Sequence, residues 1–295
     1  MSKEQLDFIL KISAENPPPA NATPPQMREW FEAINAQTPI AEGAMIETIS
    51  VGPCPAELIR LSGGDESRLV IYYHGGGFLF GSPRSHRTIA THLAKASGVT
   101  VLSVDYRLAP EHPAPTAHDD AYAAYLWALD HGYAPASVVL SGDSAGGNLA
   151  LAAAVRARDN GVQLPGCLVL MSPALDLASD GESHRSLADA PLVNRDLMAL
   201  FNMVYVGAGD LRSPDVTPFY GDVSGLPPVL VHVGSWELLR DDSITIAERI
   251  NAAGGNAELK VWEGMCHSWQ LFAPMLEEGM ASIEEAGAFV RRHAA

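Results

Sequence analysis

The stretch VVLSGDSAGGNLALAAAV, residues 138–155, carries the strongest structural signal in this sequence. It begins with β-branched and apolar residues, which predict a buried strand over Val138–Ser141. It ends in residues that favour helix, and these predict a helix over Ala145–Asn160. Gly142 and Gly146 flank Ser144 at the junction of the two elements, where glycine lets neighbouring backbone approach closely. A strand that turns sharply into a helix is typical of an α/β domain.

Strand-like and helix-like segments also alternate on both sides of this stretch. Continuous apolar strands are what a parallel sheet needs when helices cover both of its faces. We therefore predict an α/β fold with a mostly parallel central sheet flanked by helices. The other expected strands are Glu57–Leu61, Leu69–Tyr73, Val99–Val104, Cys167–Met171, Val229–Val233 and Ala257–Trp262, and Gly63-Gly64-Asp65 is expected to form a turn. The other expected helices are Ser85–Ser97, Ala117–His131, Asp242–Ala253 and Met275–His293.

Two segments interrupt this alternation, and we expect both to lie outside the main α/β domain, which residues 44–175 and 216–295 form. The first, residues 1–43, predicts two short helices separated by three consecutive prolines. The second is the insertion at residues 176–215, and insertions at strand ends of such sheets usually shape a site. In the first segment Met27, Trp30 and Phe31 recur at helical spacing. That stripe indicates either packing against the core or a lid over a substrate pocket.

Composition excludes several classes of protein. The 295 residues include 19 Lys and Arg against 35 Asp and Glu, so the formal net charge is −16. A surface this acidic disfavours nucleic acids and anionic membranes as partners. No apolar run is long enough to span a bilayer, and the first ten residues lack the apolar core of a signal peptide. The three scattered cysteines predict neither a disulfide framework nor a zinc site, so we expect a cytoplasmic protein.

Two motifs predict chemistry. Ser144 lies in the chain's G-x-S-x-G sequence, at a turn that exposes a nucleophilic hydroxyl beside the positive end of a helix. The second motif, His74-Gly75-Gly76-Gly77, follows the expected strand Leu69–Tyr73. Its glycines free the backbone to aim N–H groups at a developing oxyanion. A phosphate-binding loop would instead continue with Lys and Ser or Thr, and Phe78-Leu79 stands there.

A serine nucleophile of this kind requires a histidine base and an acid, in the chain order Ser, acid, His. Four histidines follow Ser144 in the sequence. His184 lies in the insertion, His232 inside an apolar strand and His293 at the C-terminus, so His267 is the expected base.

The acid should follow the strand Val229–Val233, and this makes Glu237 the first choice. Asp241, Asp242 and Glu263 remain rivals for that role. Asp241 and Asp242 are expected instead to cap the next helix, and Glu263 lies in the loop of the histidine itself.

Together these residues resemble the hormone-sensitive-lipase-like branch of the α/β-hydrolases, the bacterial family IV carboxylesterases. The resemblance covers the chain from about residue 45 to its end and includes the segment DYRLAPE at residues 105–111, which it implies braces the sheet near the site. It implies an oxyanion hole formed by the backbone N–H groups of Gly76, Gly77 and Ala145. It also implies that His74, Gly75 and Asp143 support the site.

The family usually has an aspartate where Glu237 stands, and glutamate is chemically competent in such triads. The resemblance further implies a helical cap built from residues 1–43 and 176–215, and hydrolysis of short- to medium-chain acyl esters through an acyl-enzyme. No metal or organic cofactor is expected, and a homodimer is expected only by analogy. An amidase or deacetylase using the same site, and a ligand receptor without catalysis, remain alternatives.

Overall fold

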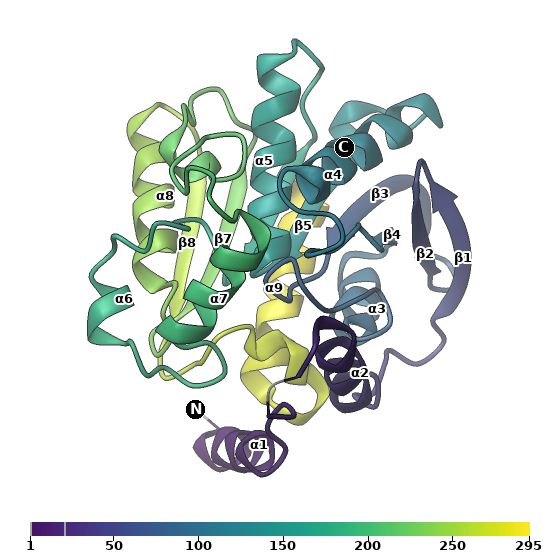
Figure 1. Ribbon diagram of the computed structural model, residues 1–295. Coiled ribbons are helices and arrows are strands. Elements are labelled where there is room, and N and C mark those ends of the chain that lie inside the picture. The colour runs from purple at the N-terminus through teal and green to yellow at the C-terminus, as the bar shows by residue number, and fades with distance from the viewer. Residues whose placement is uncertain (1, 21) are drawn as a thin grey trace.

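The computed structural model describes residues 2–20 and 22–295, and in this part of the chain one sheet of eight strands forms the centre (Figure 1). The strands lie in the order β1-β2-β4-β3-β5-β6-β7-β8. The first four in the chain are β1 Met45–Val51, β2 Cys54–Arg60, β3 Asp65–Tyr73 and β4 Val99–Val104. They are followed by β5 Val138–Asp143, β6 Cys167–Met171, β7 Val229–Gly234 and β8 Ala257–Trp262. Every pairing from β4 across to β8 is parallel, which confirms the predicted mostly parallel sheet.

Helices cover both faces of this sheet. They are α3 Arg87–Ser97, α4 Thr116–Asp130, α5 Ala145–Asp159, α8 Arg240–Ala252 and α9 Glu277–His293. Side chains of β3 alternate between the faces, as a pleated strand requires. Leu69, Ile71 and Tyr73 pack with α4 and α5, whereas Val70 and Tyr72 pack with α3 and α9. The central strands are therefore buried on both sides, and their carboxyl ends open toward one edge of the sheet.

The ends of the strands differ from prediction in several places. β1 was not predicted, because only its last residue, Val51, is buried and its sequence shows no strict alternation. Asp65, expected in a turn, begins β3, and its backbone N–H donates to the Gly98 carbonyl at 2.8 Å. β2 begins earlier than expected, at Cys54, because it pairs with the unpredicted β1.

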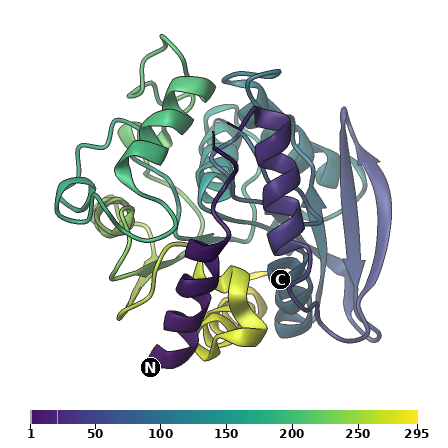
Figure 2. The same cartoon turned by 60° about the horizontal axis from the view of Figure 1, so that its bottom comes forward.

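The two segments that interrupt the alternation contain four helices. They are α1 Lys3–Glu15, α2 Pro24–Asn35, α6 Ser183–Ser186 and α7 Arg195–Tyr205. Thr23 caps α2, and its backbone N–H donates to Gln26 Oε1 at 2.9 Å. Figure 2 shows α1 and α2 on the side that comes forward, with α7 nearby. Within the described residues, no helix combines the length and apolarity needed to cross a membrane.

Candidate active site

Ser144 stands at the junction of β5 and α5, as the opening motif predicts. Its backbone adopts φ 52° and ψ −120°, a rare conformation for a residue with a side chain. The turn is tight because any Cβ at Gly146 would collide with the Tyr73 carbonyl of the neighbouring strand. The Ser144 N–H donates to the Met171 carbonyl at 2.9 Å, which fixes the turn against β6. The hydroxyl thus lies at the carboxyl end of the sheet, beside the N-terminus of α5.

His267 lies in the loop after β8 and pairs with Glu237. Its Nδ1 donates to Glu237 Oε2 at 2.8 Å. The Glu237 side chain is fully buried, and its other oxygen accepts hydrogen bonds from Ser172 Oγ at 2.7 Å and from the Gly234 N–H at 2.5 Å. A buried carboxylate needs such donors, and these hold it in one orientation. The geometry therefore brings together the base and the acid preferred in the sequence analysis.

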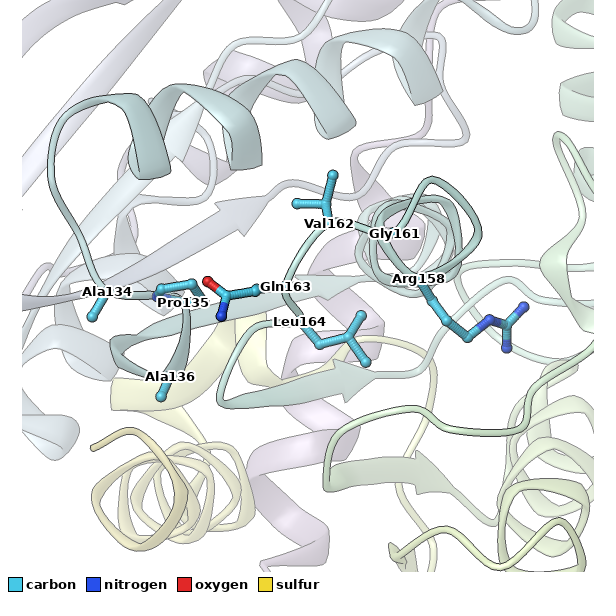
Figure 3. A pocket seen from close by; sticks show the side chains of 8 residues that line it. All are labelled: Ala134, Pro135, Ala136, Arg158, Gly161, Val162, Gln163 and Leu164. Atoms are coloured by element: carbon cyan, nitrogen blue, oxygen red, sulfur yellow. The ribbon is translucent and has the colours of Figure 1, made fainter.

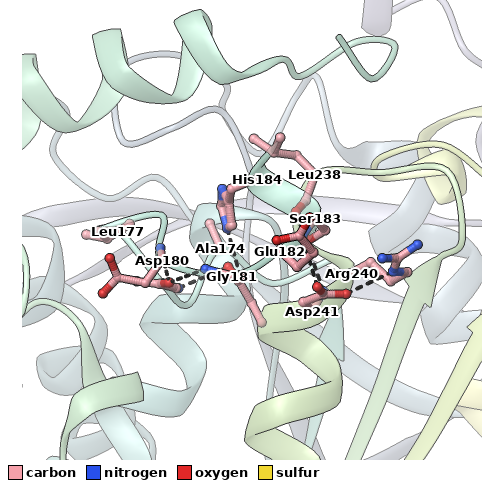
Figure 4. Close-up of polar contacts among 12 residues, drawn as sticks. Ala174, Leu177, Asp180, Gly181, Glu182, Ser183, His184, Leu238, Arg240 and Asp241 are labelled. Atoms are coloured by element: carbon pink, nitrogen blue, oxygen red, sulfur yellow. Dashed lines mark hydrogen bonds and ion pairs between the residues drawn. The ribbon is translucent and has the colours of Figure 1, made fainter. Parts of the chain in front are cut away.

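The rival aspartates occupy a different place, and the expectation that they cap α8 is wrong. α8 begins at Arg240, so both aspartates lie within its first turn and bind the insertion instead. Asp241 Oδ2 accepts the Ser183 N–H at 2.9 Å (Figure 4). Asp242 Oδ1 accepts a hydrogen bond from His184 Nε2 at 2.8 Å. Neither aspartate has a hydrogen bond to His267, and both anchor α6 to the start of α8.

Asp176, His184 and Asp242 have ligand atoms within 4.8 Å of one another, a spacing that a metal ion could use. Their oxygens are already satisfied, since Asp176 accepts hydrogen bonds from Tyr220 and from backbone N–H groups. Burial raises the pKa of Asp242 to about 6, although the hydrogen bond from His184 opposes that shift. The cluster is therefore best explained as a buried hydrogen-bond network that holds the insertion against α8.

The glycine loop follows β3 and faces the nucleophile. Gly76 and Gly77 have φ of +114° and +60°, values that favour glycine. A Cβ on Gly77 would collide with the ring of Phe201 from α7, so the insertion packs directly on this loop. The Gly75 N–H donates to Asp143 Oδ1 at 2.9 Å, which ties the loop to the residue before Ser144.

His74 is fully buried and contacts the loop that follows it. Its Nδ1 donates to the Gly75 carbonyl at 2.7 Å, and its ring stacks on Tyr106 with centroids 4.2 Å apart. Burial, and then the nearby His86, lower the pKa of His74 to about 3, so its ring stays neutral. Tyr106 Oη donates to the His74 carbonyl at 2.7 Å. The segment 105–111 thus contacts the glycine loop.

Two serines near Ser144, His267 and Glu237 were missed in the sequence. Ser172 follows β6, and its hydroxyl accepts the Ser268 N–H at 3.1 Å while it donates to Glu237. Ser268 Oγ lies 3.3 Å from His267 Nε2 and donates to Asp143 Oδ2 at 3.2 Å. Their only signal in the sequence is a small polar residue directly after a strand or after the histidine.

A cavity of about 980 Å³ opens onto these groups. Gly76, Gly77, Ser144 and His267 all line it. The predicted pocket residues Met27, Trp30 and Phe31 line it from α2, and Met27 and Phe31 also pack against the core. The rest of its apolar wall includes Phe8, Ile12, Ile34, Leu192, Leu197, Phe201, Leu271 and Met275. The stripe on α2 therefore packs against the core and also faces this cavity.

A second hollow of about 590 Å³ lies at the other end of β5 (Figure 3). It is lined by Ala134, Pro135, Ala136, Arg158, Gly161, Val162, Gln163 and Leu164. No histidine, carboxylate or nucleophilic hydroxyl or thiol is among these residues, unlike the residues that line the larger cavity.

Known proteins resemble this chain over most of its length. The family described as alpha/beta hydrolase fold matches residues 70–271. An acetyl-hydrolase of Streptomyces hygroscopicus is 42% identical over 83% of this chain and 82% of its own length. An esterase of Acinetobacter venetianus is 34% identical over 95% of this chain and 93% of its own. A solved esterase of the bacterial hormone-sensitive lipase family is 39% identical, covers 99% of both chains and superimposes with a TM-score of 0.95.

Proposed function

Because this chain belongs to the hormone-sensitive-lipase-like branch of the α/β-hydrolases and is a serine carboxylesterase, we propose an assignment of its catalytic residues. Ser144 is the nucleophile, His267 the general base and Glu237 the acid that orients it. The hydrogen bond of 2.8 Å between His267 and Glu237, at the wall of the cavity that contains Ser144, is the observation that carries this assignment.

The reaction proceeds in two halves. His267 takes the proton of the Ser144 hydroxyl as the oxygen attacks the ester carbonyl. The backbone N–H groups of Gly76, Gly77 and Ala145 stabilise the resulting oxyanion. His267 then gives its proton to the leaving alcohol, and the acyl group remains on Ser144. Water, activated by the same histidine, attacks the acyl-enzyme and releases the acid.

We further propose that the substrates are short- to medium-chain acyl esters and that residues 1–43 and 176–215 form the cap over their pocket. Support comes from the cavity wall, since α1, α2 and α7 supply most of its apolar side chains. An apolar wall suits an acyl chain, and Asp143, Ser144 and His267 line the same cavity.

The test is a series of p-nitrophenyl esters with acyl chains of two to sixteen carbons, measured with wild type and Ser144→Ala. We expect wild-type rates to peak at short chains and the variant to lose at least a thousandfold in kcat. Turnover retained by a folded Ser144→Ala variant would remove Ser144 from the mechanism. Rates that peak at the longest chains would contradict the proposed acyl range.

Cytoplasmic location and a homodimer are also proposals. The location is supported by Cys54, Cys167 and Cys266, which are all free and buried. For the dimer, support is limited to β8 as the last strand of the sheet, with Val261 partly exposed on it. Light scattering coupled to size-exclusion chromatography measures the oligomeric state directly.

A further inference from the structure

One side chain of the N-terminal segment reaches the glycine loop. Arg28 lies on α2, and its Nε donates to the Leu79 carbonyl at 2.9 Å. Its Nη2 donates to the Ala109 carbonyl at 2.8 Å. The same guanidinium forms two hydrogen bonds to the carboxylate of Glu111, at 3.0 and 2.6 Å. Arg28 therefore joins α2 to two separate segments of the catalytic domain.

The Leu79 carbonyl that Arg28 holds belongs to the turn after the glycine loop, and the Ala109 carbonyl belongs to a segment that binds this turn. The N–H groups of Leu79 and Phe80 both donate to the Gly76 carbonyl, at 3.0 and 3.1 Å. The Ala109 N–H donates to the Phe78 carbonyl at 2.9 Å. A shift of Leu79 or Ala109 would therefore move the peptide groups of Gly76 and Gly77. Only the planar guanidinium offers donors in several fixed directions at once.

Other contacts from α2 reinforce this attachment. Glu32, one turn after Arg28, accepts a hydrogen bond from Ser82 Oγ at 2.6 Å. The ring of Phe31 packs on Phe80 with centroids 4.8 Å apart. Three consecutive contacts of one helix thus reach residues 79–82. α2 therefore packs firmly against the segment that follows the glycine loop, so the position of α2 and the geometry of the loop are coupled.

We propose that Arg28 is a positioning residue for the oxyanion hole, which it aligns through the carbonyls of Leu79 and Ala109. The inference rests on the proposed function, because it requires the N–H groups of Gly76 and Gly77 to stabilise the oxyanion. Arg28 touches no reacting atom. Its effect is on the transition state, where a misplacement of about 1 Å can cost on the order of a hundredfold in rate.

The experiment compares Arg28→Ala and Arg28→Lys with wild type on p-nitrophenyl butanoate, and Ser144→Ala is included to verify the assay. We expect kcat to fall about ten- to a hundredfold in both variants, with KM within twofold of wild type. Binding of a short-chain trifluoromethyl ketone, which forms an oxyanion on serine, should weaken by the same factor as kcat/KM falls. Millimolar ethylguanidinium should partly restore the Ala variant.

The Arg28→Lys variant separates the ion pair with Glu111 from the hydrogen bonds to the two carbonyls. Lysine keeps a positive charge beside Glu111 but cannot donate to both carbonyls. Because it keeps the ion pair, this variant can still be tested if Arg28→Ala does not fold. Arg292→Ala is the matched control, because Arg292 on α9 binds the Glu258 carboxylate through two hydrogen bonds, at 3.1 and 2.9 Å, and lies outside both the proposed cap and the glycine loop.

The possible results separate the two proposals. Full activity of Arg28→Lys, or a rise in KM with kcat unchanged, would overturn the positioning role. Arg28 would then only form an ion pair with Glu111 or help to form the wall of the pocket. A lower melting temperature with unchanged kcat would do the same. Turnover that survives in Ser144→Ala would instead count against the proposed function itself.

Discussion

At the scale of single residues, the acid that we propose for the triad shows how a buried carboxylate is selected. Glu237, Asp241 and Asp242 lie within six positions of one another, and burial does not separate Glu237 from Asp242. Their partners do separate them, because Glu237 contacts His267 and Asp242 contacts His184. The additional methylene of glutamate is accommodated by the Ser172 hydroxyl and the Gly234 N–H, which hold its second oxygen.

Glu237→Gln should leave the fold intact and lower kcat by about three to four orders of magnitude. An amide cannot stabilise the imidazolium as a carboxylate does, and it allows His267 the wrong tautomer. Steady-state kinetics on a short-chain ester, together with circular dichroism, provide the measurement. Asp241→Asn is the control and should retain near-normal kcat. If Asp241→Asn loses activity and Glu237→Gln keeps it, the acid is Asp241.

Some of these residues could be predicted from the sequence and others could not. Ser144 and His267 follow from a local motif and from chain order, which depend on neighbouring residues alone. Ser172 and Ser268 depend on how two distant loops meet: the 3.1 Å hydrogen bond between them joins residues 96 positions apart. No local pattern encodes that distance, so such supporting hydroxyls become visible only in the folded chain.

At the scale of elements, prediction succeeded where burial is two-sided. The strands Val99–Val104 and Cys167–Met171, in which every residue is buried, have the predicted bounds, and so does the partly exposed edge strand Ala257–Trp262. β1 was not predicted because an edge strand with one buried residue leaves no periodic signal. The predicted start of α8 was wrong because its aspartates form tertiary contacts with the insertion, and these contacts override the local capping preference.

Helix α2 forms part of the wall of the cavity, so shortening a side chain there should change substrate preference. Trp30 is half-buried in that wall, and its Nε1 donates to the Asn16 carbonyl beyond the end of α1 at 3.1 Å. We expect Trp30→Ala to shift the optimal acyl chain upward by at least two carbons, because removal of the indole enlarges the cavity. The p-nitrophenyl ester series measures that optimum.

Trp127→Ala is the matched control for Trp30→Ala. Trp127 is also half-buried but stacks on His131 with centroids 4.0 Å apart, and it does not line the cavity. Its loss should lower the melting temperature and leave the acyl profile unchanged. An unchanged optimum in Trp30→Ala would mean that α2 packs against the core without shaping the pocket.

At the scale of the whole molecule, buried histidines couple the fold to pH. Burial, and then Lys260, lower the pKa of His232 to about 3. Burial also lowers the pKa of His118 to about 4, and His74 is shifted to about 3 by burial and His86. His184 has the opposite shift: burial opposes protonation, but the hydrogen bond and charge of Asp242 raise its pKa.

The sign of the effect follows from these shifts. Unfolded histidine titrates near pH 6.5, so below that value the unfolded chain binds protons that the folded chain refuses. The stability from His74, His118 and His232 is therefore fully present above about pH 6.5. It is lost as the pH falls toward their folded pKa values, about 3 to 4. Each such residue contributes a slope of up to about 1.4 kcal/mol per pH unit in that window.

Unfolding of wild type between pH 6 and pH 4 should take up about one more proton than unfolding of His232→Gln. The unfolding free energy of the variant should therefore depend less steeply on pH in this range. The measurement is urea unfolding of wild type and variant at several pH values across that range. His131→Gln, at an exposed position on the C-terminal side of α4, is the control for loss of an imidazole in general. Because carboxylates and His184 contribute equally to all three proteins, the difference in slope isolates His232. An equal slope in His232→Gln and wild type would mean that the folded protein already protonates this histidine above pH 4, despite its burial beside Ser282.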